Sequence, residues 1–129
     1  MKHHQTEIHQ AIDVLQANLS HVARVVEWSN IMGFDHPQKF AYKFLRHYQV
    51  RPLKVLDYMR LKSIIHQLRS DRRYSNLEIA LAHSLPDEKA LNNFTNYHLG
   101  VPPRRLKSMS EAELKRSFQK FGNKIQEQI

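Results

Sequence analysis

The chain has 129 residues, of which 20 are Lys or Arg and 12 are Asp or Glu, so its formal net charge at pH 7 is +8 with His neutral. This excess of cations favours polyanionic partners. The absence of Cys excludes a disulfide framework and a Cys-ligated zinc site, and it is typical of a reducing cytosol. No apolar run approaches the roughly 18–20 residues of a bilayer span, and the start lacks a secretory leader. We therefore expect a soluble cytoplasmic protein with no membrane partner.

Scarce Gly and well-placed Pro predict a mostly helical chain. Hydrophobic periodicity predicts helices over about 6–19, 22–32, 37–48, 52–70, 76–83, 87–99 and 111–128. Asp35 is expected to cap the helix that Pro37 opens, because Pro is tolerated in a first turn. Gly33 and Gly100 are expected to end their helices. Ser110 begins a capping-box pattern before the last helix.

The middle of the chain repeats itself at an offset of 51 residues. The matched pairs are Glu27 with Glu78, Phe34 with Leu85, Phe40 with Leu91, His47 with His98, Val50 with Val101 and Pro52 with Pro103. Two copies of one supersecondary unit are too few for a solenoid. Each copy is typical of a helix, a tight turn and a second helix, a shape that can lay one helix into a DNA groove.

The order of these parts is similar to that of a known family. The matching residues are Gly33-Phe34, Phe40, Phe44, Val50 and Pro52, then Arg60-Leu61 and Leu68, then Glu78-Ile79-Ala80, Leu91 and Gly100-Val101-Pro102-Pro103. Over about residues 8–106 the chain resembles the AraC/XylS family of bacterial transcription regulators, and its length is similar to that of stand-alone members of the MarA and SoxS type. The resemblance implies two helix-turn-helix lobes joined by one long helix.

Several positions depart from the family pattern. Ser84-Leu85 stands where the second lobe has Gly-Phe, and Gln49 replaces a Gly. Ser29 replaces a small apolar residue. Thr95 stands where a buried Phe is expected, and the adjacent Phe94 suggests a compensating shift of register.

The predicted fold class is all-α, with two helix-turn-helix subdomains joined by a long linker helix and followed by a C-terminal amphipathic helix. The predicted parts are a first lobe (1–52), a linker helix (53–70), a second lobe (71–107) and a C-terminal extension helix (108–129). The apolar face of the last helix either folds back onto one lobe or forms a dimer or partner surface through residues 111–128.

The candidate DNA contacts are the side chains that point away from the predicted core. With Phe40, Phe44 and Leu91 inside, the candidate base contacts are Gln38, Lys39, Ala41, Tyr42, Glu88, Lys89, Asn92 and Asn93, at spacings that touch base edges in the family. Gln and Asn pair with adenine, Lys with guanine and Glu with cytosine. The candidate phosphate contacts are Lys43, Arg46, Arg51, Arg72, Arg73, Arg104 and Arg105. The alternative is that these side chains are ordinary solvated surface.

Charge supports this assignment, because the window from His36 to Leu77 holds ten Lys or Arg and two Asp and so carries the whole net charge. Nine His invite a metal hypothesis, but they show no ligand spacing, and His47 and His98 are expected at helix ends as imidazolium ions. No catalytic motif is present, so neither an enzyme, a metal nor a cofactor is expected.

The sequence thus predicts a nucleoid-associated regulator that binds double-stranded promoter DNA as a monomer on an asymmetric site. The family resemblance implies activation by contact with RNA polymerase. No effector pocket is indicated, so control would lie in the amount of protein. Two rivals remain open: an adaptor that binds another protein through the last helix or second lobe, and a non-specific nucleoid or RNA binder.

Overall fold

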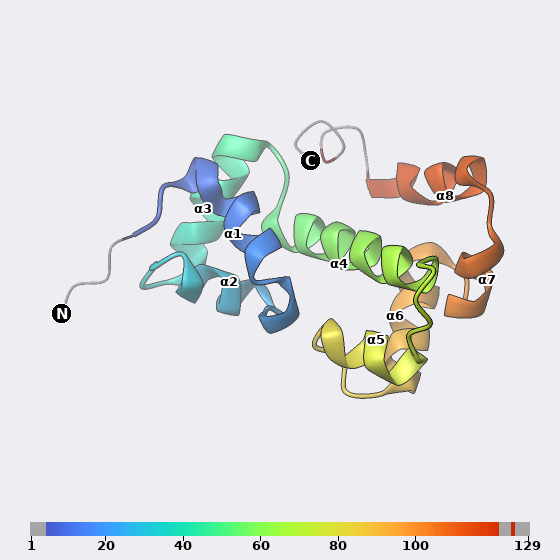
Figure 1. The fold of residues 1–129 in the computed structure, drawn as a ribbon. Coiled ribbons are helices and arrows are strands. Elements are labelled where there is room, and N and C mark those ends of the chain that lie inside the picture. Colours follow the sequence, from blue (N-terminus) through green and yellow to red (C-terminus); the bar gives the residue numbers. More distant parts are fainter. Residues whose placement is uncertain (1–4, 122–124, 126–129) are drawn as a thin grey trace.

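The computed structural model describes residues 5–121 and 125 (Figure 1). Within them the chain is all-helical, as predicted, with eight α-helices, three short 3₁₀ helices and no strand. None of the helices in this part of the chain combines the length and the apolar character needed to cross a membrane.

Helix α4 lies at the centre of the molecule, and the other helices are arranged around it (Figure 1). The helices are η1 (Ile8–Gln10), α1 (Ala11–Ala17), η2 (Leu19–His21), α2 (Val25–Ile31), α3 (Pro37–Tyr48), α4 (Pro52–Leu68), α5 (Asn76–Ala82), α6 (Glu88–Leu99), α7 (Pro103–Ser108), α8 (Glu111–Phe118) and η3 (Gln119–Phe121). Helices α1–α3 gather at the amino end of α4, and α5–α7 gather around its carboxyl end (Figure 1). We call α2–α3 the first helix pair and α5–α6 the second.

The 51-residue repeat is also a repeat of helix boundaries. Adding 51 to the bounds of α2 gives those of α5, adding 51 to those of α3 gives those of α6, and α4 and α7 begin at the equivalent Pro52 and Pro103. The positive-φ residues of the described chain form two equivalent pairs, Gly33 (83°) with Ser84 (60°) and Gln49 (60°) with Gly100 (75°). The sequence and the backbone conformation therefore repeat at the same offset of 51 residues.

The turn inside each helix pair closes in the same way. The Phe34 amide donates to the Ser29 carbonyl at 3.1 Å, and the Leu85 amide donates to the Ala80 carbonyl at 2.9 Å. Ser84 therefore adopts the left-handed conformation of Gly33 although it carries a side chain, at a cost of about 1 kcal/mol. The two copies therefore differ in the residue at this position and share the same turn.

Two predicted helix boundaries near the amino end are wrong. The helix expected over about 6–19 is divided into η1, α1 and η2, because α1 ends where the Asn18 side chain turns back to donate to the Val14 carbonyl at 2.8 Å. The helix expected from Val22 begins at Val25, because the Glu27 carboxylate accepts hydrogen bonds from the backbone amides that precede it.

The predicted cap at Asp35 is also wrong. His36 is the N-cap of α3, and its backbone is extended (φ −131°, ψ 129°), as expected for the residue before a proline. In the second helix pair the equivalent residue, Asp87, is the N-cap of α6, and its carboxylate accepts the Ala90 amide at 2.8 Å.

The capping box at the start of the last helix is confirmed: the Ser110 hydroxyl accepts the Glu113 amide, and the Glu113 carboxylate accepts the Ser110 amide, both at 3.1 Å. Up to residue 121 the predicted helix consists of α8, which ends at Phe118, and η3, which follows it. Beyond Phe121, the predicted helix to residue 128 lies outside the described residues except at Ile125, which is buried.

The two helix pairs have different cores. In the first pair, Trp28 packs edge-on against Phe40 and Phe44, with ring centroids 5.1 and 5.0 Å away. In the second pair, Thr95 is fully buried, while Phe94 lies only partly buried with the Arg60 guanidinium 4.6 Å from its ring. The predicted shift of register at Phe94 is therefore wrong, and the small Thr95 occupies the core position itself.

Replacing Ser29 by Ala should stabilise the protein by roughly 1 kcal/mol. The Ser29 hydroxyl is completely buried and has no hydrogen-bond partner among the described residues. The equivalent residue in the second copy of the repeat is Ala80, which has no hydroxyl group. Ser63→Ala is the matched control, because that hydroxyl is paired with His83 at 2.7 Å and its loss should destabilise. Urea unfolding measures both, and a lower unfolding midpoint for S29A would contradict the packing described here.

Candidate nucleic-acid interface

Helix α3 turns one side to the core and the opposite side outward. Phe40, Phe44 and Tyr48 are buried at intervals of four residues. Of the predicted base contacts on this helix, Gln38, Lys39 and Tyr42 are exposed, while Ala41 is only partly so. The outward face is therefore polar and accessible in the way that base contact requires.

Helix α6 repeats this arrangement. Leu91, Thr95 and Leu99 are buried, and the four predicted contacts Glu88, Lys89, Asn92 and Asn93 are exposed. The offset of 51 places Lys89, Asn92 and Asn93 on the positions of Gln38, Ala41 and Tyr42. It places Glu88 on Pro37, so the two predicted sets agree at three positions of four.

One predicted phosphate contact is tied to a predicted base contact. Arg46 donates to the Tyr42 hydroxyl at 2.8 Å, and its guanidinium carbon lies 5.6 Å from the Tyr42 ring centroid. The hydrogen bond to Tyr42 raises the pKa of Arg46 above its ordinary value. The two side chains form one cationic, aromatic surface on the outward side of α3.

Sequence reasoning missed Tyr97. This side chain is 82% exposed on the outward face of α6, one turn beyond Asn93. The repeat could have found it, because an offset of 51 places Tyr97 on the position of Arg46.

The predicted phosphate contacts fall into two separated groups. Lys43, Arg46 and Arg51 lie on or directly after α3, and all three are exposed. The other four, Arg72, Arg73, Arg104 and Arg105, are exposed beyond the carboxyl end of α4 and on α7. In this second group the Arg72 guanidinium lies 4.6 Å from the Tyr74 ring, and Arg105 approaches Glu113 at 3.4 Å.

Charge differs between the two outward faces. Helix α3 carries Lys39, Lys43 and Arg46 and no carboxylate. Helix α6 carries Lys89 beside Glu88, and Asp87 caps it. The first helix pair therefore presents a strong positive face, and the second presents a nearly neutral face rich in amides.

A line of polar side chains on α4 holds the second helix pair. Arg60 is 5% exposed and donates to the His83 carbonyl at 2.7 Å. One turn earlier, Asp57 lies 3.8 Å from His98 of α6. Burial raises the pKa of Asp57 to about 6 against the opposing attraction of Arg60.

His98 lies in the last turn of α6, as predicted, but the imidazolium expected there is wrong. Burial lowers the pKa of His98, and the nearby Lys120 and Arg60 lower it further. At neutral pH the ring is therefore uncharged, and its approach to Asp57 is a contact between a neutral imidazole and a carboxylate.

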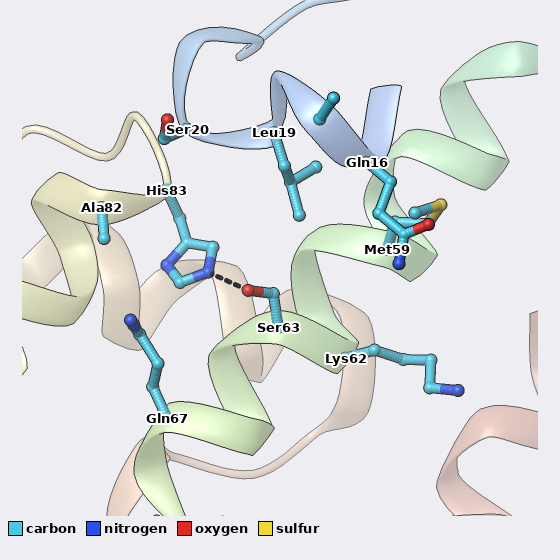
Figure 2. A pocket seen from close by; sticks show the side chains of 10 residues that line it. Gln16, Leu19, Ser20, Met59, Lys62, Ser63, Gln67, Ala82 and His83 are labelled. Atoms are coloured by element: carbon cyan, nitrogen blue, oxygen red, sulfur yellow. Dashed lines mark hydrogen bonds between the residues drawn. The ribbon is translucent and has the colours of Figure 1, made fainter. Parts of the chain in front are cut away.

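The structure also has a pocket that the sequence did not indicate, with a volume of about 530 Å³ (Figure 2). Its lining comes from three separate segments, α1–η2, α4 and α5, so no local pattern predicts it. His83 projects between Ala82 and Ser63 there, with Nδ1 2.7 Å from the Ile79 carbonyl and Nε2 2.7 Å from the Ser63 hydroxyl. Because a carbonyl only accepts, Nδ1 carries the proton and Ser63 donates to Nε2, an arrangement that ties α5 to α4.

Comparison with protein-family models, with curated proteins and with solved structures finds no match to this chain. Among the described residues, no three His, Asp or Glu side chains come together in a way that could hold a metal ion. What the chain does has to follow from its own residues and their arrangement.

Replacing Asp57 by Asn should change how stability depends on pH. Because folding raises the pKa of Asp57 from 3.8 to about 6, folding favours the protonated carboxyl. The stability it contributes is complete below the unfolded pKa and is lost as the pH rises through about 6. D57N lacks this loss, so its free energy of unfolding relative to wild type should increase between about pH 4.5 and pH 7.5. Urea unfolding across that range measures the difference, and parallel profiles would contradict the burial of Asp57.

Proposed function

We propose that the chain is a sequence-specific transcription regulator that binds double-stranded DNA, with the first and second helix pairs acting as helix-turn-helix units. The observation that carries this proposal is the repeat of α3 in α6, each with one buried side and one exposed polar side. A helix of this kind after a short turn enters the major groove in helix-turn-helix proteins. The resemblance to the AraC/XylS family supports the same arrangement.

The spacing of the two helices suits one face of a duplex. Helix α4 has 17 residues and is about 25 Å long at 1.5 Å per residue. Helices that pack against its two ends lie a further 8–10 Å from its axis. A separation of about 34 Å, one turn of DNA, is therefore within reach without any change in α4.

The side chains on the two outward faces match the chemistry of base edges. The amides of Gln38, Asn92 and Asn93 can pair with adenine, and Lys39 and Lys89 can donate to guanine. Each such contact would discriminate against a wrong base by roughly 1–3 kcal/mol. The predicted phosphate contacts on and after α3, beyond α4 and on α7 would hold phosphates and set the register without reading sequence.

The two outward faces differ in sequence, so the two half-sites they read also differ. A single chain would then occupy an asymmetric promoter site on the nucleoid. The resemblance to stand-alone family members suggests activation through contact with RNA polymerase.

A second candidate function is that of an adaptor. Leu77 and Leu81, spaced four residues apart on α5, are 43% and 58% exposed, an apolar pair of the kind that protein partners cover. Selection of binding sites from a random duplex pool separates the two functions. An enriched sequence supports the regulator, and no complex with any duplex at low salt supports the adaptor.

Gln38→Ala and Asn92→Ala should each change which sequences win that selection, since each removes an amide from an outward face. The preference should relax at one position of the site, and the two variants should affect positions about one helical turn apart. Asn30→Ala, at an exposed position of α2 outside both faces, is the control and should select the wild-type site. Unchanged preferences in both variants would remove these side chains from the reading face.

Arg46→Ala should weaken binding to all duplexes alike and reduce the slope of log affinity against log salt by about one. The reason is that Arg46 contributes charge on the outward side of α3 and also supports Tyr42. Arg24→Ala is the control, because that exposed arginine caps α2, away from the outward side of α3. Fluorescence anisotropy at several salt concentrations measures both slopes. A loss confined to one sequence would show that Arg46 reads a base.

A further inference from the structure

A groove of about 600 Å³ runs between the carboxyl ends of α3 and α6. Its walls are Leu45 on α3, Arg51 and Lys54 at the start of α4, Tyr97 on α6 and Lys120 in η3. Four separate segments therefore meet at one hollow between the two helices proposed to read DNA.

The groove opens on the same side as the outward face of α3. Gln38, Tyr42 and Leu45 follow one another at intervals of four and three residues, which places them along one stripe of α3, and Gln49 is the C-cap residue that follows the helix. The first two are candidate base contacts, and the last two line the groove. On α6, Tyr97 likewise lies one turn beyond Asn93, so each outward face continues into the groove.

The groove is cationic. Arg51, Lys54 and Lys120 are exposed along it, against the single carboxylate of Asp57. Asp57 is half-buried, and the buried guanidinium of Arg60 stands one turn away on the same helix. The field at the mouth of the groove is therefore set by the three cations.

Lys120 is held in place by the aromatic residues on either side of it. Phe118 and Phe121 pack edge-on against Tyr58 of α4, with ring centroids 5.3 and 5.5 Å away. Phe121 also stacks on His98 of α6 at 6.3 Å. The segment from α8 to η3 thus folds back along α4 and carries a lysine to the gap between the two helix pairs.

We infer that this groove holds the sugar-phosphate backbone between the two reading segments, with Lys54 and Lys120 as phosphate contacts. The inference rests on the proposed function: if α3 and α6 enter successive major-groove segments, the minor groove between them faces this hollow, and its rims are phosphates. Leu53, 55% exposed, and Tyr97 then lie against deoxyribose. Through Lys120, the η3 segment that follows α8 thereby belongs to the DNA interface.

Lys54→Ala and Lys120→Ala test the inference with the full chain and its selected duplex. Each should weaken binding about three- to tenfold and reduce the salt slope by about one, while the selected sequence stays the same. Lys115→Ala is the matched control, because Lys115 lines a different hollow, between α8 and α4, and should leave both quantities unchanged.

The outcomes separate this inference from the proposed function. Sequence-specific binding by the wild type, with unchanged slopes in both K54A and K120A, overturns the inference and leaves the regulator intact. A wild type without any sequence preference overturns the regulator and the inference with it. Lys120→Arg keeps the charge and should restore the slope, whereas failure to restore it despite an unchanged melting temperature would overturn the role of Lys120 as a phosphate contact.

Discussion

The structure depends on the burial of α4. Ten of its seventeen residues are buried, and they lie on several sides of the helix, which is the pattern of a core helix and not of an amphipathic surface helix. Both helix pairs pack against this one element, and so do α7, Phe118 at the end of α8 and Phe121 in η3. The relative placement of α3 and α6 is therefore determined by what each pair contacts on α4.

The two pairs are stabilised by different kinds of contact. The first has a core of aromatic rings around Trp28, whose indole nitrogen also donates to the Ala11 carbonyl at 3.0 Å. The second is held by Arg60 on the His83 carbonyl and by Ser63 on the His83 ring. Apolar packing tolerates small shifts, whereas buried polar contacts need their partners in place. The contacts of Arg60 and Ser63 with His83 are therefore sensitive to small shifts of the second pair on α4.

The repeat made much of the fold predictable, because two matching copies reinforce every turn, cap and buried position that they share. The bounds of α3 and α6 were predicted to within a residue for this reason. The amino-terminal helix lacks a second copy, and its division at Asn18 depends on one side-chain hydrogen bond that periodicity does not contain. The Asp57–His98 contact and the groove at Lys120 join residues far apart in the chain, so no local pattern indicates them.

The contrast in charge between α3 and α6 has a kinetic consequence. Of the two outward faces, that of α3 attracts an approaching duplex more strongly, because it carries three cations and α6 has almost no net charge. On the proposed function, the first helix pair binds the duplex first. The amides of the second pair then meet the neighbouring bases at a high effective concentration. The association rate would then depend mainly on the half-site bound by the first helix pair, and the lifetime of the complex on the half-site bound by the second.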